Sequence, residues 1–414
     1  MRLKMKTRKE ITKEAAKRYR KASKADKGRI LDEFCATTGY NRSYAARMLG
    51  KRQSGAGGKA RAAKRPPGAR GQGGKPVYTE EVMAPLVKIW AILNFPCGKR
   101  LVANLAEIVR VLEGFGEVTL SPQVKEKLLS MSAATADRLL ASERKKTELR
   151  SRSKAKPGSL LKHRVPIRTF ADRDDVRPGF LEIDPVGHDG GSARGDCCRS
   201  LDGVDVASGW IELRAVKNKA QRWVFEAIED MRGTLPFPLL GIDSDTGAEF
   251  SNAHLIEYCK RERITFTRSR PCRKNDNCYV EQKNYTAVRQ YVGYFRYDTD
   301  ERLLLLSRLH EALCPYLNLF QPQAKPMEKA REGSRVRKRY DEPNTPYRRL
   351  LESPEIDELT KRKLRRQYAK LNPARLMREI NSLQGKLFEM VGYGVVDHAK
   401  EAGQEGICFE QIFL

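Results

Sequence analysis

Three acidic side chains in this 414-residue chain stand out by their type and their spacing. Asp184 lies inside the apolar stretch Phe180–Val186, where a carboxylate is costly unless it is paired, protonated or bound to a metal. Asp245 follows a second apolar stretch and precedes Gly247, which lets the backbone turn sharply and so supports the site. Glu281 comes later, with 35 residues between it and Asp245.

These acids indicate metal-dependent chemistry on phosphate esters. Three carboxylates that converge repel one another unless cations compensate their charge. Two Mg²⁺ or Mn²⁺ ions, about 3.5–4 Å apart, compensate it and promote in-line attack on a phosphodiester. We therefore expect Asp184, Asp245 and Glu281 to be catalytic and to bind two such ions. Taken singly, each acid could instead end a strand, form a turn or lie at a helix N-terminus.

Asp243 competes with Asp245 for this role, because it stands two residues earlier, at the end of the apolar stretch. Gly247 and the pair Glu249-Phe250 that follow favour Asp245. Glu249 itself is expected to be structural or to lie near a DNA end.

Alternating strands and helices are predicted around these acids, over residues 178–292. The predicted strands are Phe180–Val186, Arg199–Val206, Trp210–Val216, Leu239–Asp243 and Ile264–Thr267, and the predicted helices are Lys219–Arg232, Asn252–Arg261 and Cys278–Val292. Three hairpin-connected strands, followed by helix, strand, helix, strand and helix, are the element order of a ribonuclease H-like fold.

The chain resembles integrase-type DDE transposases of bacterial insertion sequences, which are related to retroviral integrases. The resemblance covers roughly residues 166–322 and depends on Asp184 in Phe-Leu-Glu-Ile-Asp-Pro-Val, Asp245 in Asp-Thr-Gly-Ala-Glu-Phe, and Glu281 followed by Asn284. Two aspartates and a glutamate 35 residues beyond the second are the hallmark of that family. Asn284 follows Glu281 by one helical turn and is expected to support the site.

The resemblance implies a transposase that binds the terminal repeats of a mobile element, cleaves 3′ ends and transfers them to target DNA. It implies that Asp184 bridges both metal ions, that Asp245 binds one, and that Glu281 binds the other. No covalent protein–DNA intermediate is expected. The zinc module of retroviral integrases is not expected, because the chain has five His and no C-x₂-C pair.

Two other functions stay open. A ribonuclease H-like nuclease or resolvase would hydrolyse DNA without strand transfer, although the helical modules before the core argue against it. A domesticated DNA-binding protein would keep an inactive core, although the intact acid triad argues against that.

The charge of the chain predicts double-stranded DNA as the partner. Residues 1–75 carry a net charge of +18 out of the total of +28, whereas residues 166–325 carry −1. A basic arm beside a neutral core is typical of nucleic-acid enzymes. No apolar run reaches the ~18 residues of a membrane span, and the N-terminus does not look like a secretory signal. We expect a bacterial cytoplasmic protein associated with the nucleoid.

A helix-turn-helix is predicted over residues 11–49. Ser23 and Asp26 form a capping pair, Gly39 ends that helix, and Asn41 caps a second helix. We expect the second helix to expose Arg42, Ser43 and Arg47 to DNA and to bury Ala45 and Leu49. An ordinary helical hairpin is the alternative.

A second helix-turn-helix is predicted before the core. Ser121-Pro122 begins one helix, and Ser132 caps the next, with Thr135 and Arg138 facing outward as DNA contacts. A plain helical packing domain explains the same pattern.

Basic residues around Glu281 are expected to contact DNA phosphates. They are Arg268, Arg270, Arg273 and Lys274 in a loop, and Lys283 and Arg289 on the following helix. A solvated loop is the alternative.

The predicted fold class is a multidomain α/β protein, in which a ribonuclease H-like mixed-sheet core is flanked by N-terminal helix-turn-helix modules and a C-terminal helical region. The predicted domains are residues 1–52 (first module), 53–76 (basic Gly-rich linker), 77–143 (second module), 144–165 (basic linker), 166–325 (core) and 326–414 (basic linker and C-terminal helices).

In the C-terminal region an apolar stripe predicts either a dimer seam or a core face. The stripe consists of Leu376, Ile380, Leu383, Leu387 and Met390. Because transposases pair two DNA ends, we expect a homo-oligomer.

Overall fold

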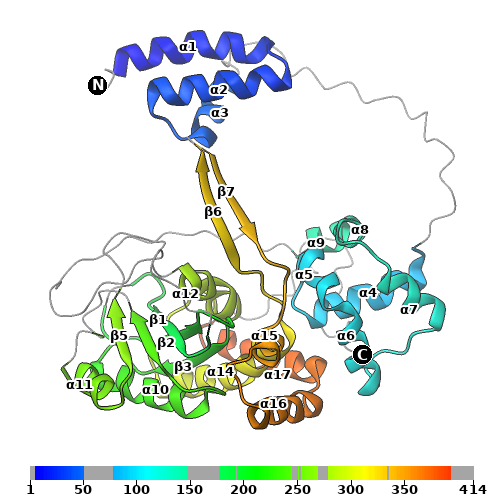
Figure 1. Ribbon diagram of the computed structural model, residues 1–414, viewed down its shortest axis with the longest axis vertical. Coiled ribbons are helices and arrows are strands. Elements are labelled where there is room, and N and C mark those ends of the chain that lie inside the picture. The colour runs from blue at the N-terminus through cyan, green and yellow to red at the C-terminus, as the bar shows by residue number, and fades with distance from the viewer. Residues whose placement is uncertain are drawn as a thin grey trace. The chain divides into compact units, whose positions relative to one another are not determined.

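A computed structural model describes residues 5–50, 78–147, 177–192, 194–244, 250, 253–268, 278–332 and 335–392. The chain divides into two compact units (Figure 1). The smaller unit joins Met1–Pro76 to Lys325–Asp341, and the larger unit joins Val77–Ala324 to Glu342–Leu414. No helix in the described part of the chain is long and apolar enough to cross a membrane.

A five-stranded mixed sheet forms the centre of the larger unit (Figure 1). The strand order is β3-β2-β1-β4-β5, in which β1 pairs antiparallel with β2, and β2 antiparallel with β3, while β4 and β5 continue the sheet in parallel on the other side. The strands are β1 (Phe180–Gly187), β2 (Arg199–Asp205), β3 (Ile211–Val216), β4 (Gly241–Ser244) and β5 (Thr265–Arg268).

The two faces of this sheet differ because alternate residues of β1 point to opposite sides. Leu181 and Ile183 belong to a hydrophobic cluster with residues of α10 (Gln221–Thr234) and α11 (Ala253–Arg261). Glu182 and Asp184 bond instead to a continuous helical segment that covers the other face. That segment consists of α12 (Cys278–Lys283), the π-helix η2 (Asn284–Arg289) and α13 (Gln290–Val292).

The element order and strand arrangement confirm the predicted fold class, and the strand bounds differ from the predicted ones by two residues at most. One major element was not predicted. The 21-residue α14 (Asp300–Phe320) packs against β3 and contributes many residues to the larger of the two hydrophobic clusters around the sheet. Thr299 begins it by accepting a hydrogen bond from Arg302 N, which is a capping signal that the sequence does contain.

In the described part of the larger unit, six helices precede the sheet. They are α4 (Glu80–Ile92), α5 (Gly98–Ala103), α6 (Leu105–Gly114), α7 (Pro122–Leu129), α8 (Ala133–Leu139) and α9 (Ala141–Thr147). Ser121 and Ser132 cap α7 and α8 as predicted. These helices share one hydrophobic cluster with α14 and the C-terminal helices. The second module therefore packs on the core, although the sequence predicts it as a separate domain.

Among the residues described up to position 392, three helices follow the core, α15 (Pro346–Glu352), α16 (Glu358–Lys370) and α17 (Pro373–Glu389). Leu376, Ile380 and Leu387 of α17 are buried in the same hydrophobic cluster, and α17 packs against α14. The apolar stripe is therefore a core face. A dimer seam along it is wrong, because its side chains are already covered by this chain.

The smaller unit contains α1 (Met5–Lys21), α2 (Lys24–Thr38) and α3 (Arg42–Gly50). Ser23 caps α2, and Gly39 ends it in the left-handed region at φ 69°. Ala45 and Leu49 are fully buried, as predicted.

Residues expected to form a basic linker after the core instead form an antiparallel hairpin, β6 (Pro326–Glu332) and β7 (Arg335–Tyr340). The predicted linker 53–76 and most of the linker 144–165 lie outside the described residues.

Candidate active site

Four acidic residues lie on the face of the sheet that α12 covers. Glu182 and Asp184 belong to β1, Asp202 to β2 and Asp243 to β4. In the strand register Asp184 pairs with Asp202, and Glu182 pairs with Asp243, so each pair shares a face. Neighbouring carboxylates repel one another, and oxygen ligands of this kind suit Mg²⁺ or Mn²⁺. The donor set therefore fits hard divalent cations.

Asp184 is partly exposed at this face, as a catalytic group must be. Its Oδ2 accepts a hydrogen bond from Asn284 Nδ2 at 2.5 Å. The two residues are 100 positions apart in the chain, and both were singled out from the sequence. The structure thus brings Asp184 and its expected supporting residue together.

Glu182 is an acidic residue of this face that the sequence analysis did not single out. Its buried Oε2 accepts hydrogen bonds from Tyr279 N and Val280 N, both at 2.9 Å. These N–H groups belong to the first turn of α12, which would otherwise leave them unsatisfied. Glu182 therefore joins the strand of Asp184 to the helix of Glu281. Its position two residues before Asp184, on the same face of an apolar strand, was the available signal.

Asp202 was also missed. Neither oxygen of its buried carboxyl group has a hydrogen-bond partner among the described residues. Burial raises the pKa of Asp202 well above its usual value, Lys283 opposes this shift, and Asp184 adds to it. Asp202 is therefore a buried carboxyl group without a hydrogen-bond partner among the described residues, and it pairs with Asp184 in the strand register. Such groups are rare in folded proteins.

Of the other two acids of the predicted triad, Asp245 and Glu281, neither side chain is described. Asp245 and Gly247 are outside the described residues, and so is the side chain of Glu281, which belongs to α12. The ladder between β1 and β4 ends at the pair Ile183–Ser244. These residues directly precede Asp184 and Asp245 in the sequence. Within the described part, no group of three or more acidic, His or Cys side chains is arranged around a metal position.

Two basic residues of the predicted DNA surface, Lys283 and Arg289, are only partly exposed. Arg289 donates Nη2 to the Gly187 carbonyl oxygen at 2.6 Å and Nη1 to that of Gly293 at 3.2 Å, which fixes η2 to the end of β1. Lys283 lines a pocket, where burial, followed by Arg100, lowers its pKa to about 7. Arg289 therefore bonds within the chain and Lys283 lines the pocket, and the expected contact of both with DNA phosphates stays a prediction.

The predicted basic loop before α12 is described only at its start. Arg268 ends β5 and is partly buried. Arg270, Arg273 and Lys274 lie outside the described residues.

Of the three α3 residues predicted to be exposed to DNA, Arg42 is mostly covered instead. It forms an ion pair with Asp32 and donates a hydrogen bond to the Gly28 carbonyl oxygen at 3.4 Å, so it fastens α3 to α2. Ser43 and Arg47 are exposed as expected.

In the second module Arg138 is exposed and donates to Thr135 Oγ1 at 3.0 Å. Thr135 is only partly exposed, and its hydroxyl group lies 2.9 Å from that of Ser132.

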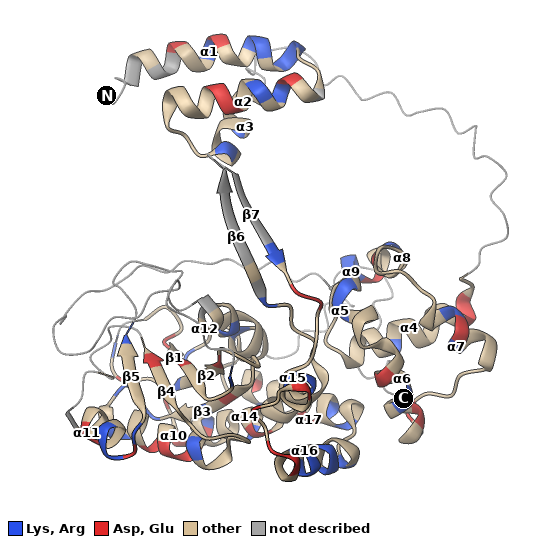
Figure 2. Cartoon of the chain, viewed as in Figure 1, with Lys and Arg blue, Asp and Glu red and all other residues tan. Residues whose placement is uncertain are grey.

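A further basic surface escaped the sequence analysis. Figure 2 shows a row of Lys and Arg along α16. Most of these side chains are exposed; they are Arg362, Lys363, Arg365, Arg366 and Lys370. This face of α16 is therefore strongly basic.

Comparisons with known proteins give one full-length relative. "Uncharacterized protein y4rM" of Sinorhizobium fredii is 39% identical over 348 residues, which cover 84% of this chain and 96% of that protein. No protein-family model matches the chain.

Among solved structures, the catalytic core domain of HTLV-2 integrase in complex with magnesium, in a trimeric form, is 17% identical and covers 36% of this chain and 90% of its own, with a TM-score of 0.28. The catalytic core domain of BIV integrase is 17% identical and covers 42% and 94%, also with a TM-score of 0.28.

Proposed function

Since the chain belongs to the same family as y4rM of Sinorhizobium fredii, we propose for it the function that its own residues favour, that of a DDE-type DNA transposase. It would bind the ends of a mobile element, cleave the 3′ strands and join them to target DNA. The observation that carries this proposal is the acidic face of the sheet, with Glu182, Asp184, Asp202 and Asp243 on three neighbouring strands. Carboxylates on neighbouring strands repel one another, and bound divalent cations would compensate that repulsion.

Each residue has a role in this proposal. Asp184, Asp245 and Glu281 hold two Mg²⁺ or Mn²⁺ ions, and Asn284 orients the Asp184 carboxylate through its hydrogen bond. Glu182 keeps α12 in register with β1, which supports the position of Glu281. When bound, the ions activate a water or 3′-hydroxyl nucleophile and stabilise the leaving oxygen. The chain needs no nucleophile of its own.

DNA binding is assigned to polar and basic residues whose side chains are exposed in the structure. Ser43 and Arg47 on α3, Arg138 on α8, and the row on α16 would contact phosphates or base edges. Pairing of two DNA ends requires a homo-oligomer, whose interface must lie away from the buried stripe of α17.

The experiment that tests the proposal uses the full chain with Mg²⁺, labelled DNA carrying the element ends and a plasmid target. Asp184→Asn and Asp245→Asn should lower the yield of joined product by about 10²–10³-fold or more, as for loss of a group that stabilises the transition state. Glu257→Gln is the matched control, because Glu257 is an exposed acid on the opposite face of the sheet.

The outcomes separate the alternatives. Joined product that depends on both aspartates supports a transposase. Cleavage without joining would mean a nuclease or resolvase. DNA binding with neither reaction, and unchanged by the aspartate substitutions, would mean an inactive core used only for binding.

A further inference from the structure

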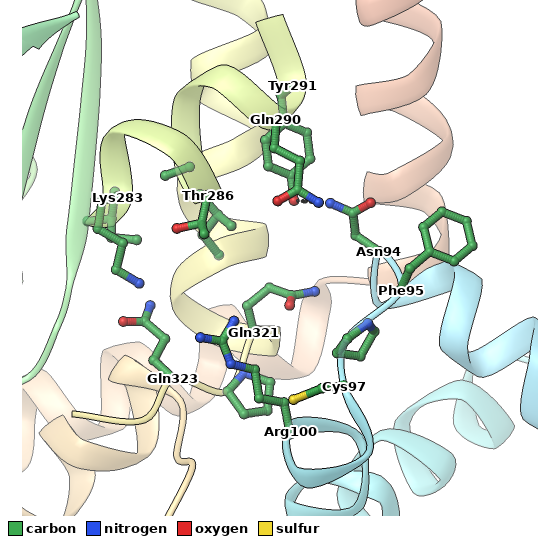
Figure 3. A pocket seen from close by; sticks show the side chains of 15 residues that line it. Asn94, Phe95, Cys97, Arg100, Lys283, Thr286, Gln290, Tyr291, Gln321 and Gln323 are labelled. Atoms are coloured by element: carbon green, nitrogen blue, oxygen red, sulfur yellow. Dashed lines mark hydrogen bonds between the residues drawn. The ribbon is translucent and has the colours of Figure 1, made fainter. Parts of the chain in front are cut away.

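A cavity of about 220 Å³ lies within the larger unit, on another side of the helical segment that carries Glu281 and Asn284 (Figure 3). Three parts of the chain line it: the turn between α4 and α5, the segment from Lys283 to Tyr291, and the end of α14 with the residues after it. Among the described residues that line it, the charged ones are Arg100 and Lys283, and none is acidic.

The two cations face the same space. Figure 3 shows the ends of Lys283, Arg100 and the Gln323 amide pointing toward one another. Among the described residues, neither Arg100 nor Lys283 has a hydrogen bond or an ion pair. Asp202 acts electrostatically on Lys283 from the sheet, but it does not line the cavity. Two cations that face one space repel one another, and an anion between them would relieve that repulsion.

The wall of this cavity is fixed before any ligand binds. Asn94 and Phe95 both have left-handed backbone conformations, with φ of 57° and 58°, which is rare for a bulky residue such as phenylalanine. Asn94 Nδ2 donates to Tyr291 Oη at 2.8 Å, and Gln321 Nε2 donates to the Leu93 carbonyl oxygen at 2.8 Å. Strained backbone that the surroundings hold in place is concentrated at binding sites.

The size and the donors of the cavity indicate which anion fits. At about 220 Å³ it is smaller than the roughly 300–1,000 Å³ of a site for a whole cofactor. A guanidinium fork, an ammonium group and side-chain amides match the oxygens of a phosphate group. Phe95 and Leu317 add apolar surface that a sugar ring could contact.

We propose that this cavity is a phosphate-binding site that seats one phosphate group of a DNA strand beside the acidic face. Arg100 and Lys283 would bind the phosphate oxygens, and Gln323 would donate a further hydrogen bond. That the phosphate belongs to DNA rests on the proposed function, whereas the recognition of a phosphate group does not.

Cys97 provides a direct probe, because it lines the cavity and is exposed. The full chain is labelled with a maleimide, and the rate at Cys97 is followed by mass spectrometry of its peptide. Inorganic phosphate and a short single-stranded oligonucleotide should each slow the labelling severalfold, while acetate at equal ionic strength should not. Arg100→Gln should abolish this protection, and so should Lys283→Gln.

Lys99→Gln is the matched control, because Lys99 is an exposed neighbour outside the cavity lining. It should keep full protection. Circular dichroism of each variant checks that it is folded.

Three results would overturn the proposal. These are no protection by phosphate, equal protection by acetate, and an Arg100→Gln variant that behaves like Lys99→Gln. Protection by phosphate but not by the oligonucleotide would remove DNA as the source.

The test does not depend on catalysis. A chain that joins DNA but shows no protection at Cys97 would keep the proposed function and lose this site. A chain that shows protection but neither cleaves nor joins DNA would keep the site and lose the function.

Discussion

Glu182 illustrates how a single buried acid can position a helix. A buried carboxylate costs free energy unless hydrogen bonds compensate it, and here two N–H groups at the start of α12 do so. Asp205, also buried, accepts hydrogen bonds from Gly179 N and from the backbone N and Oγ of Ser208. The hydrogen-bond partners distinguish the two acids. Glu182 bonds to the first turn of a helix, whereas Asp205 bonds to Ser208 in the turn after its own strand.

Glu182→Ala should leave two backbone donors unsatisfied, at a cost of about 1–3 kcal/mol in the free energy of unfolding. We expect faster amide hydrogen exchange at Tyr279 and Val280 and a lower rate of strand transfer. Glu182→Gln keeps an accepting oxygen and should retain most of the protection. Unchanged exchange at both amides in Glu182→Ala would contradict the role assigned to this residue.

At the scale of elements, the π-helix η2 lets one helical segment contact the acidic face, the hydrophobic core and the cavity. A π-turn inserts one residue into an α-helix, and such turns recur at functional sites. Asn284 bonds to Asp184, Ala287 and Val288 are buried in the core, and Lys283 faces the cavity. The extra residue sets the rotation between these faces.

Deletion of Tyr285, whose side chain is 51% exposed, should restore α-helical spacing. The residues before it would then rotate by about 100° relative to those after it. We expect Asn284 to lose Asp184 and strand transfer to be abolished, while circular dichroism still shows a helical protein. Tyr285→Ser keeps the chain length and should remain active. An active deletion variant would show that the π-turn is dispensable.

Two buried histidines link the sheet to α14. His188 Nε2 lies 2.8 Å from Ser200 Oγ, which lies 3.1 Å from His310 Nε2. Burial, followed by Arg289, lowers the pKa of His188 well below its usual value, and burial, followed by Arg214, lowers that of His310 to about 3. Both are therefore neutral in the folded protein.

This chain of histidines should make stability fall in acid. An unfolded histidine binds a proton below a pH of about 6.5, whereas the folded ones resist protonation, so the unfolded state gains protons as the pH falls. The free energy of unfolding should drop between pH 6.5 and 4 by up to about 1.4 kcal/mol per pH unit for each histidine. Urea unfolding at several pH values measures it.

The control for that measurement comes from the same chain. His310→Gln should have a shallower pH dependence than the wild type, whereas His254→Gln should match the wild type because His254 is exposed. Equal slopes for the wild type and His310→Gln would contradict the prediction.

At the scale of the whole molecule, the second helical module, the sheet and the C-terminal helices of the larger unit share one hydrophobic cluster. Glu117, after α6, fixes this arrangement by accepting from Arg378 Nη1 at 3.0 Å, Arg378 Nη2 at 2.7 Å and Asn372 Nδ2 at 2.6 Å. Its hydrogen bonds with Arg378 lower the pKa of Glu117. These hydrogen bonds hold the second helical module, which supplies the cavity wall between α4 and α5.

Glu117→Gln should lower the free energy of unfolding by about 1.5–3 kcal/mol, the range for hydrogen bonds to a charged group. Glu113→Gln should cost less, because its pair with Lys125 is more exposed. The fluorescence of Trp90 in the module and of Trp210 in the core should change in one transition. Two separate transitions would show that the module folds independently.

The sequence by itself determined the order and nearly the bounds of the elements of the core, because hydrophobic periodicity and caps such as Ser121 and Ser132 are local signals. It also indicated Asp184 and Asn284 from their types and spacing. Only the tertiary structure decided which side chains share a surface. Glu182 meets Tyr279 and Asp202 meets Asp184 through strand pairing and helix docking.

The same reason explains the errors. Arg42 and the apolar stripe of α17 have the composition of exposed or intermolecular surfaces, but each is covered by a neighbour from elsewhere in this chain. Periodicity tells which residues share one side of an element. It does not tell what lies against that side, because the free energy that decides this comes from contacts between residues far apart in the sequence.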